Sequence, residues 1–476
     1  MLNTLLTLCL LGTPADVAQI VAQDITEPDF QKYIWIPNAS EDYAAEVNFT
    51  FNEIVSRTDL LVRPVVLADG QLLRYDLRQL ATNANDLLDL QFLFLDIAFD
   101  DPYFYLRTPD HTLIDVAPYT LNGKQYTQKH LRVSVPQYQV PLGSVFRFDK
   151  FIEITNRTVS PGRYYDFVDI DDLNLKEFLA RLDIRIEELD NFTKDERAAL
   201  FESKPTHKQR LIKILTSNVV RPSKSRGIVA VTYDITDEQQ EAINDPLENL
   251  LNFDFAAYEI IVDRPNGTHL YALYDKAGKL LKEGDPKIAA DHKEAEKLGT
   301  KVLQAGLSCR RCHAYGHGWQ DFRNDVLTML DDGFSVVDDL QSPFTQDETL
   351  SILARLYNSE PSKGPFSVLE IGRQMYRSTV SKITVGRTLP MMGDILDEIH
   401  TNYNLRVTPD QACIELGIKT EDSLKTLREI FPNIPGKPEL QPVGSLKRGI
   451  PLQRTQFERV YPYLMTGVLN ANITNN

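Results

Sequence analysis

The sequence predicts an α+β fold, in which a mixed N-terminal domain of helices and strands precedes an all-helical domain. β-Branched and aromatic runs separated by turn residues fill most of the chain before residue 280. Beyond that point apolar residues recur at helical spacing and no convincing strand follows. At 476 residues the chain is long enough for more than one domain. We therefore expect a boundary near residues 280–290, with domains at 19–285 and 286–476.

Strands are predicted first where apolar and aromatic residues cluster between turn residues. The segments are "KYIWIP", "LLVRPVVLA", "QLLRYDL", "FRFDKFIEI" and "RYYDFV", and residues 77–100 interrupt them with a helical pattern. Leu175, Leu179, Leu182 and Ile186 then recur at three- and four-residue spacing, which predicts an amphipathic helix. The segment "HKQRLIKILTS" predicts a second helix.

Strand patterns return at "GIVAVTYDI", "AAYEIIVDRP" and "THLYALYD". Asn266 and Gly267 separate the last two segments, and this pair supplies the positive φ angles that a tight hairpin requires. A hairpin across residues 259–275 is therefore expected to lead into the helical domain.

The helical domain is predicted from apolar periodicity and from helix starts. Thr345 to Glu348 has the pattern of a capping box, and Thr408, Pro409 and Gln411 mark another start. The expected helices are 291–304, 319–331, 345–358, 367–380, 389–403, 408–416, 420–430 and 452–468.

Charge and hydropathy limit the partners. The formal net charge is −16, from 51 basic and 67 acidic side chains, so most of the surface would repel a nucleic-acid backbone. No internal apolar run is long enough for a transmembrane helix.

Residues 1–18 have the outline of a secretory signal with an apolar core, although no basic residue precedes Lys32. A structural N-terminal helix is the alternative.

Cys309, Cys312 and His313 form the one motif that carries recognisable chemistry. In Cys-x-x-Cys-His each thiol can add to a haem vinyl group, and the adjacent imidazole becomes the proximal iron ligand. A zinc site would need further ligands, and Cys413 has no Cys or His at zinc spacing. A redox disulfide would normally follow a strand in a βαβ unit, whereas this motif opens the predicted all-helical domain. The sequence favours one haem c over both alternatives.

The sixth iron ligand is less defined. His317 follows the proximal histidine by four residues, on the same helical face, and is disfavoured. Met391 and Met392 follow a proline, where a thioether could reach the iron, and they are the preferred candidates. Met329, Met375, Met465 and His400 are alternatives, as is an open sixth position. Arg310 and Arg311 are candidates to pair with the haem propionates, and Tyr315 and Trp319 to flank the ring.

The stretch from "YEIIVDRPNGTHLYALYDKAGKLLKEGDPKIAAD" to "LQAGLSCRRCHAYGHGWQDFRNDV" resembles bacterial proteins, abundant in planctomycetes, that are described as cytochrome c domain-containing. The matching positions outside the motif are Glu259, Ile260, Pro265, Asn266, Gly267, Tyr271, Asp275, Gly278, Pro286, Ile288, Asp291, Gly306, Leu307, Ser308 and Gly316. Ser225 departs from the family, which carries asparagine there.

The resemblance implies an exported protein with one covalently attached haem, a periplasmic or other extracytoplasmic location, and one-electron transfer with an unidentified redox partner protein. This reading favours an electron-transfer protein over a substrate-transforming enzyme. A haem enzyme or sensor with an open sixth iron site, able to bind peroxide or a small gas, is the alternative.

Overall fold

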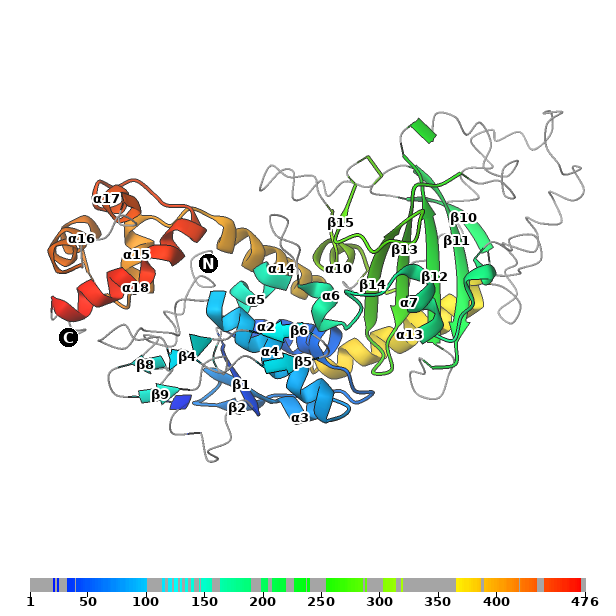
Figure 1. Ribbon diagram of the computed structural model, residues 1–476, viewed down its shortest axis with the longest axis horizontal. Helices are drawn as coiled ribbons and strands as arrows, with labels where there is room; N and C mark the ends of the chain where they lie inside the picture. Colours follow the sequence, from blue (N-terminus) through cyan, green and yellow to red (C-terminus); the bar gives the residue numbers. More distant parts are fainter. Residues whose placement is uncertain are drawn as a thin grey trace, which may run out of the picture. The chain divides into compact units, whose positions relative to one another are not determined.

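The computed structural model describes parts of the chain between residues 20 and 471 (Figure 1). The stretches left out are 1–19, 22–23, 25–31, 39, 101–113, 116–118, 122–123, 127–128, 131–132, 136–137, 141–144, 146, 156–162, 190–197, 204–207, 220–226, 237, 240–253, 286, 289–302, 314–317, 320–364, 387–388, 419, 435–440 and 472–476. The predicted signal, residues 1–18, and the predicted helices 291–304, 319–331 and 345–358 fall wholly or mainly there.

The chain forms two compact units. The first contains Met1–Asn48, Val62–Ile154 and Asp394–Asn476, and the second contains Phe49–Leu61 and Thr155–Gly393. This division differs from the expected boundary near 280–290, because the 259–275 hairpin and the Cys-x-x-Cys-His motif belong to the same unit. The fold is mixed α and β, as predicted, but each of the two units combines a β-sheet with helices.

The first unit begins with a three-stranded antiparallel sheet in the order β1-β3-β2. Its strands are β1 (Tyr33–Pro37), β2 (Val65–Leu67) and β3 (Leu72–Asp76). Helices α2 (Glu41–Thr50), α3 (Leu77–Leu80) and α4 (Ala84–Asp100) accompany the sheet. These strands and the helical pattern over 77–100 agree with the sequence predictions.

Short strands follow as three antiparallel pairs, which the sequence did not predict. They are β4 (Ile114–Asp115), β5 (Tyr119–Leu121), β6 (Lys124–Tyr126), β7 (Lys129–His130), β8 (Val133–Val135) and β9 (Tyr138–Val140).

Two predicted strands are helices. "FRFDKFIEI" forms α5 (Phe148–Thr155), where Phe148, Phe151, Ile152 and Thr155 are buried at helical spacing. "RYYDFV" contains the short helix α6 (Tyr164–Phe167), which belongs to the second unit. Aromatic residues dominate both segments, and aromatic enrichment alone wrongly favoured strands.

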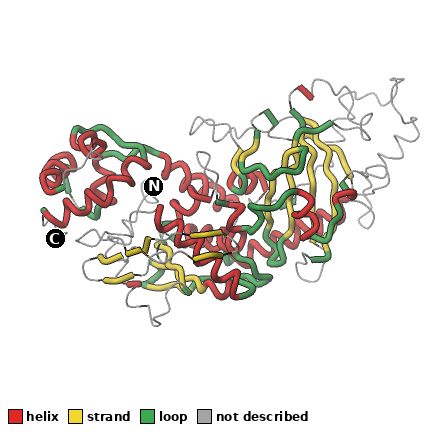
Figure 2. The backbone as a smooth tube through the Cα atoms, viewed as in Figure 1, coloured by secondary structure: helices red, strands yellow, loops and turns green. Residues whose placement is uncertain are grey.

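The C-terminal part of the first unit is helical, as expected (Figure 2). Val407, Leu427, Phe457 and Tyr461 belong to its apolar core. Thr408 caps α15 by accepting a hydrogen bond from the Gln411 amide at 3.2 Å, which confirms the predicted helix start. The helices are α14 (Leu389–Asn404), α15 (Pro409–Glu415), α16 (Ser423–Ile430), α17 (Gln441–Lys447) and α18 (Arg454–Asn470), with a 3₁₀ turn at Phe431–Asn433.

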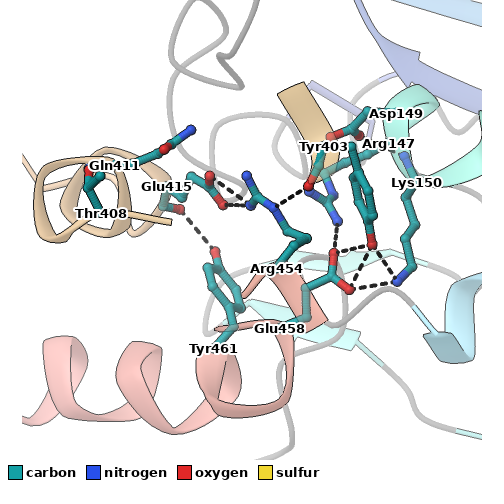
Figure 3. A network of polar contacts seen from close by, with 10 residues as sticks. All are labelled: Arg147, Asp149, Lys150, Tyr403, Thr408, Gln411, Glu415, Arg454, Glu458 and Tyr461. Carbon is teal, nitrogen blue, oxygen red and sulfur yellow. Dashed lines mark hydrogen bonds and ion pairs between the residues drawn. The ribbon is translucent and has the colours of Figure 1, made fainter. Parts of the chain in front are cut away.

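A buried ionic network ties α5, α14 and α18 together (Figure 3). The Glu458 carboxylate lies 2.7 Å from Arg147 Nη2 and 2.6 Å from Lys150 Nζ. The Tyr403 hydroxyl also donates to Glu458, at 2.9 Å. Beside this group, Arg454 pairs with Glu415 at 2.6 Å. Helices far apart in sequence are therefore joined through charges removed from water.

The second unit is built on a five-stranded antiparallel sheet in the sequential order β10-β11-β12-β13-β14. The strands are β10 (Ala198–Ser203), β11 (Lys208–Ser217), β12 (Gly227–Asp234), β13 (Ala257–Asp263) and β14 (His269–Asp275). Every residue of β12 is buried, so both faces of the sheet are covered. Strand β11 is the segment predicted as a second helix, and that prediction is wrong.

Helices lie on the two faces of this sheet (Figure 1). The predicted amphipathic helix is α7 (Leu175–Arg181), followed by a 3₁₀ turn at Ile186–Glu188, and Phe178 stacks on Tyr274 of β14. The predicted helix 367–380 is α13 (Pro365–Ile383), where Tyr376 stacks on His269 with ring centroids 4.1 Å apart. His269 and Tyr274 point to opposite faces because they are an odd number of residues apart in one strand.

The tyrosines of α6 bind the outer edge of β14. The backbone N–H groups of Tyr271 and Leu273 donate to the hydroxyls of Tyr164 and Tyr165, each at 3.0 Å. The Tyr165 hydroxyl then donates to the Leu281 carbonyl at 3.0 Å. Both hydroxyls are thereby fixed by the backbone of the sheet edge.

The predicted hairpin joins β13 and β14. The Gly267 N–H donates to the Arg264 carbonyl at 2.8 Å, and the Arg264 N–H donates to the Thr268 carbonyl at 2.7 Å. Only Gly267 has a positive φ, 84°, so the loop is longer than the two-residue turn expected from Asn266-Gly267. Asn266 instead donates through its side chain to the Asn52 carbonyl at 2.7 Å.

Gly267→Ala is expected to lower the free energy of unfolding by roughly 2–4 kcal/mol, because positive φ and overpacking both penalise the new methyl group. A Cβ atom there would collide with the Thr379 side chain of α13. Gly386 has a similar φ of 80° but open space around it, so Gly386→Ala should cost only about 1–2 kcal/mol. Chemical denaturation of both variants measures the difference, and equal losses would argue against the close approach at Gly267.

Within the described part of the chain, the helices are all too short or too polar to cross a membrane.

Candidate functional site

The Cys-x-x-Cys-His motif lies on helix α10 (Leu307–His313). Before it, β15 (Glu283–Gly284) and β16 (Leu303–Gln304) pair as a short antiparallel ladder. Gly306 then turns the chain with a φ of 88°, a conformation that favours glycine. The Arg310 N–H donates to the Gly306 carbonyl at 2.8 Å and begins the helix. Cys309, Cys312 and His313 therefore lie on one short helix that begins directly after this tight turn.

Cys309 and His313 share one face of α10, because they are four residues apart. The Cys309 side chain is buried. Burial raises the pKa of the Tyr164, Tyr165 and Tyr271 hydroxyls well above the usual value, and the nearby Cys309 thiol adds to these shifts. Cys309 thus lies near a group of tyrosines on β14 and α6. The side chains of Arg311 and Cys312 lie outside the described residues.

His313 Nδ1 lies 3.4 Å from the Gly318 carbonyl oxygen. A carbonyl can only accept a hydrogen bond, so this contact selects the tautomer with its proton on Nδ1. The lone pair able to bind a metal is then on Nε2. The His313 ring also lies 6.1 Å from the Tyr271 ring, tilted by 35°.

The His313 pKa is lowered to about 4. Burial is the largest cause, the nearby His269 and Arg210 side chains lower it further, and the hydrogen bond with the Gly318 carbonyl acts in the opposite direction. The imidazole is therefore neutral at pH 7, which is the form that binds a metal ion.

In a Cys309→Ala/Cys312→Ala chain, His313 is expected to titrate near pH 4. Since its folded pKa lies below the usual 6.5, the unfolded chain binds a proton first as the pH falls. The stability contributed by neutral His313 is therefore present above pH 6.5 and is lost as the pH falls towards 4. NMR titration measures the pKa, and urea unfolding with His313→Gln as control measures the stability. A midpoint near 6.5 would contradict the lowered pKa of this histidine.

Arg310, predicted to bind a haem propionate, is buried and has a protein partner. Its Nε lies 2.6 Å from Glu53 Oε2, and both side chains are almost wholly removed from solvent, at 2% and 0% exposed. Nη1 donates to Thr50 Oγ1 at 2.9 Å, and the guanidinium lies over the Phe49 ring at 4.9 Å. Glu53 lies in a π-helix, Phe51–Val55, that follows α2 directly. A propionate would have to compete with Glu53 for this arginine.

Trp319, predicted to flank the haem, is also buried. Its Nε1 donates to Asp263 Oδ1 at 3.1 Å, and its ring centroid lies 4.9 Å from that of His269. Tyr315 and His317 lie outside the described residues.

The candidates for the sixth ligand are distributed over several elements. Met391 and Met392 lie in α14, with side chains outside the described set, and Met375 lies in α13. Met465 packs against the C-terminal core of the first unit. His400 is buried, with Nδ1 3.7 Å from Glu153 Oε2 in that same unit. Met329 is outside the described residues, and Met391 or Met392 stays a prediction.

A search of the described residues finds no cluster of three or more His, Cys, Asp or Glu placed to hold a metal ion.

Three residues at this site were not identified from the sequence. Asp263, Gly318 and Glu53 contact Trp319, His313 and Arg310, respectively. Only Asp263 has a local indication, since it ends the strand before the hairpin turn. Glu53 precedes Arg310 by more than 250 residues, and no periodicity links such distant positions.

Fold and site together define a mixed α/β protein with a neutral, oriented histidine beside a buried cysteine on a short helix. No family model, curated protein or solved structure matches this chain.

Proposed function

We propose that this chain is an exported c-type cytochrome that carries one haem and transfers single electrons to and from a partner redox protein outside the cytoplasm. In this proposal Cys309 and Cys312 form the thioether bonds and His313 is the proximal iron ligand. The observation that carries the proposal is the state of His313, which is neutral, with Nδ1 facing the Gly318 carbonyl, within a Cys-x-x-Cys-His motif.

The residues present fit a haem. An iron-binding histidine commonly donates its second ring N–H to a carbonyl, which sets the tautomer and the ring orientation. Cys309 lies on the same helical face as His313, and Tyr271 contributes an aromatic surface next to the imidazole. The family resemblance described above supports the same assignment. When bound, the haem supplies a one-electron iron couple.

The protein's own part is positioning and exclusion of water. Helix α10 fixes the spacing of Cys309 and His313, and the Gly318 carbonyl holds the Nδ1 proton. Burial of Cys309 and Tyr271 lowers the local polarity, and low polarity around a redox centre changes its reduction potential. Electron transfer requires no further proton movement by these residues.

The test is expression in a bacterial periplasm together with cytochrome c maturation machinery. Haem that stays on the chain in a denaturing gel, with a low-spin reduced-minus-oxidised spectrum unchanged by carbon monoxide, supports the proposal. Cys309→Ala with Cys312→Ala should abolish covalent haem, and His313→Ala should abolish the low-spin spectrum. Cys413 is another buried thiol, so Cys413→Ala is the matched control and should retain haem.

Absence of haem in the unmodified chain would refute the proposal. Binding of carbon monoxide would instead support the alternative function, a haem enzyme or sensor with an open sixth iron site. For the sixth ligand, Met391→Ala, Met392→Ala and the double variant are compared, and an unchanged low-spin spectrum in all three would exclude both methionines.

A further inference from the structure

Asp263 ends strand β13 and binds groups from three other parts of the second unit. Its Oδ2 accepts a hydrogen bond from the Ile228 N–H of β12 at 2.9 Å. Its Oδ1 accepts from Trp319 Nε1 at 3.1 Å and lies 3.4 Å from His269 Nε2. The carboxylate is buried, at 6% exposed. A buried carboxylate with two N–H donors has a fixed orientation, because losing either bond leaves a desolvated acceptor.

Residues Gly318 and Trp319 are also held against α13. A Cβ atom on Gly318 would lie 2.7 Å from Tyr376 Cδ1, and Gly318 has a φ of 50°. A Cβ atom on Gly372 would lie 2.7 Å from Trp319 Cδ1 and 2.8 Å from Nε1. The two glycines allow the dipeptide to pack directly on the helix. Trp319 is then anchored to Asp263 on one side and to Gly372 on the other.

This anchoring determines where the Gly318 carbonyl points. The carbonyl belongs to the peptide bond that links Gly318 to Trp319, and it faces His313 Nδ1 at 3.4 Å. A rotation of that peptide would have to move the indole out of its position between Asp263 and α13. Asp263 therefore acts on His313 through Trp319 and the Gly318 carbonyl, without touching the imidazole.

We propose that Asp263 and Trp319 are positioning residues that set the reduction potential of the iron bound by His313. This inference rests on the proposed function. A hydrogen bond from Nδ1–H to a carbonyl makes the imidazole a stronger donor to iron. A stronger donor favours the oxidised, more positively charged iron and so lowers the reduction potential. Releasing the Gly318 carbonyl therefore raises it.

The principal test is Trp319→Phe, which keeps an aromatic ring but removes the N–H that binds Asp263. The midpoint potential of the haem-loaded variant is expected to rise, and Asp263→Asn, which retains one acceptor oxygen, should shift it in the same direction by less. Trp35 is the matched control, since it is the other tryptophan of the chain. It is buried and its Nε1 donates to Asp24 Oδ2 at 2.8 Å. Trp35→Phe should leave the potential unchanged.

A second measurement does not depend on haem. In the Cys309→Ala/Cys312→Ala chain, ¹⁵N–¹H correlation spectra should show His313 with its proton on Nδ1. Adding Trp319→Phe should produce a mixture of tautomers, whereas adding Trp35→Phe should not. If the unmodified chain takes up no haem, the proposed function fails and the tautomer alone decides the positioning role. An unchanged tautomer in the Trp319→Phe chain, or an unchanged potential in the haem-loaded variant, overturns the inference.

Discussion

Glu458→Gln is expected to lower the free energy of unfolding of the first unit by about 3–5 kcal/mol, the cost of breaking a buried ion pair from one side. Arg147, Lys150 and Glu458 are 5%, 2% and 7% exposed. Glutamine has nearly the same shape as glutamate but has no charge, so two buried cations lose their common anion. Tyr403, which donates to both carboxylate oxygens, loses one acceptor as well.

Chemical denaturation, followed by a probe in the first unit, measures this loss. Glu429 is exposed on α16 of the same unit, so Glu429→Gln is the control and should change stability by less than about 0.5 kcal/mol. Equal effects of the two substitutions would show that the network contributes nothing beyond surface charge.

The Glu458 carboxylate also makes the stability of the first unit depend on pH. Burial by itself would raise the Glu458 pKa, but the charges of Arg147 and Lys150 outweigh it and hold the pKa below the usual 4.5. A depressed carboxyl pKa stabilises the fold above 4.5, and this contribution is lost as the pH falls through the folded value. Glu458→Gln should therefore unfold with less pH dependence below 4.5 than the unmodified chain.

Glu53→Gln is expected to lower the free energy of unfolding of the second unit by about 3–5 kcal/mol, because it also breaks a buried ion pair from one side. The Arg310 guanidinium would keep Thr50 and the Phe49 ring but lose the carboxylate at 2.6 Å. Since Arg310 lies between Cys309 and Cys312, the loss should appear first as faster amide hydrogen exchange in α10.

Glu238 is exposed and belongs to the same unit, so Glu238→Gln serves as the control for both measurements. Unchanged exchange in α10 together with a stability loss under about 1 kcal/mol would mean that the pair is no stronger than a surface salt bridge.

Local sequence patterns predicted many of the helices and strands. Strands β1, β12, β13 and β14 and helices α13, α15 and α18 lie close to the expected positions. β11 was predicted as a helix because Leu211, Ile214 and Leu215 stand at three- and four-residue spacing, although both faces of this strand are buried. A run buried on both faces has no alternation, and its spacing is equally compatible with a helix.

The site shows the same contrast. Cys309, Cys312 and His313 were proposed as haem-attachment residues from spacing alone, because the chemistry of haem attachment would act within five consecutive residues. Arg310, a candidate partner for a haem propionate, is buried against Glu53. Long-range pairs such as Glu53 with Arg310 depend on tertiary packing, which leaves no pattern in a single sequence.

The α6 tyrosine hydroxyls that bind the β14 backbone have a consequence for association between molecules. β14 is the last strand of its sheet, and an outer strand with unpaired N–H groups can recruit a strand from another chain. Tyr164 and Tyr165 occupy the N–H groups of Tyr271 and Leu273, and the Leu281 N–H takes the Leu273 carbonyl at 2.8 Å. These two N–H groups and the Leu273 carbonyl are therefore not available to a strand from another chain, which disfavours edge-to-edge pairing along this part of β14.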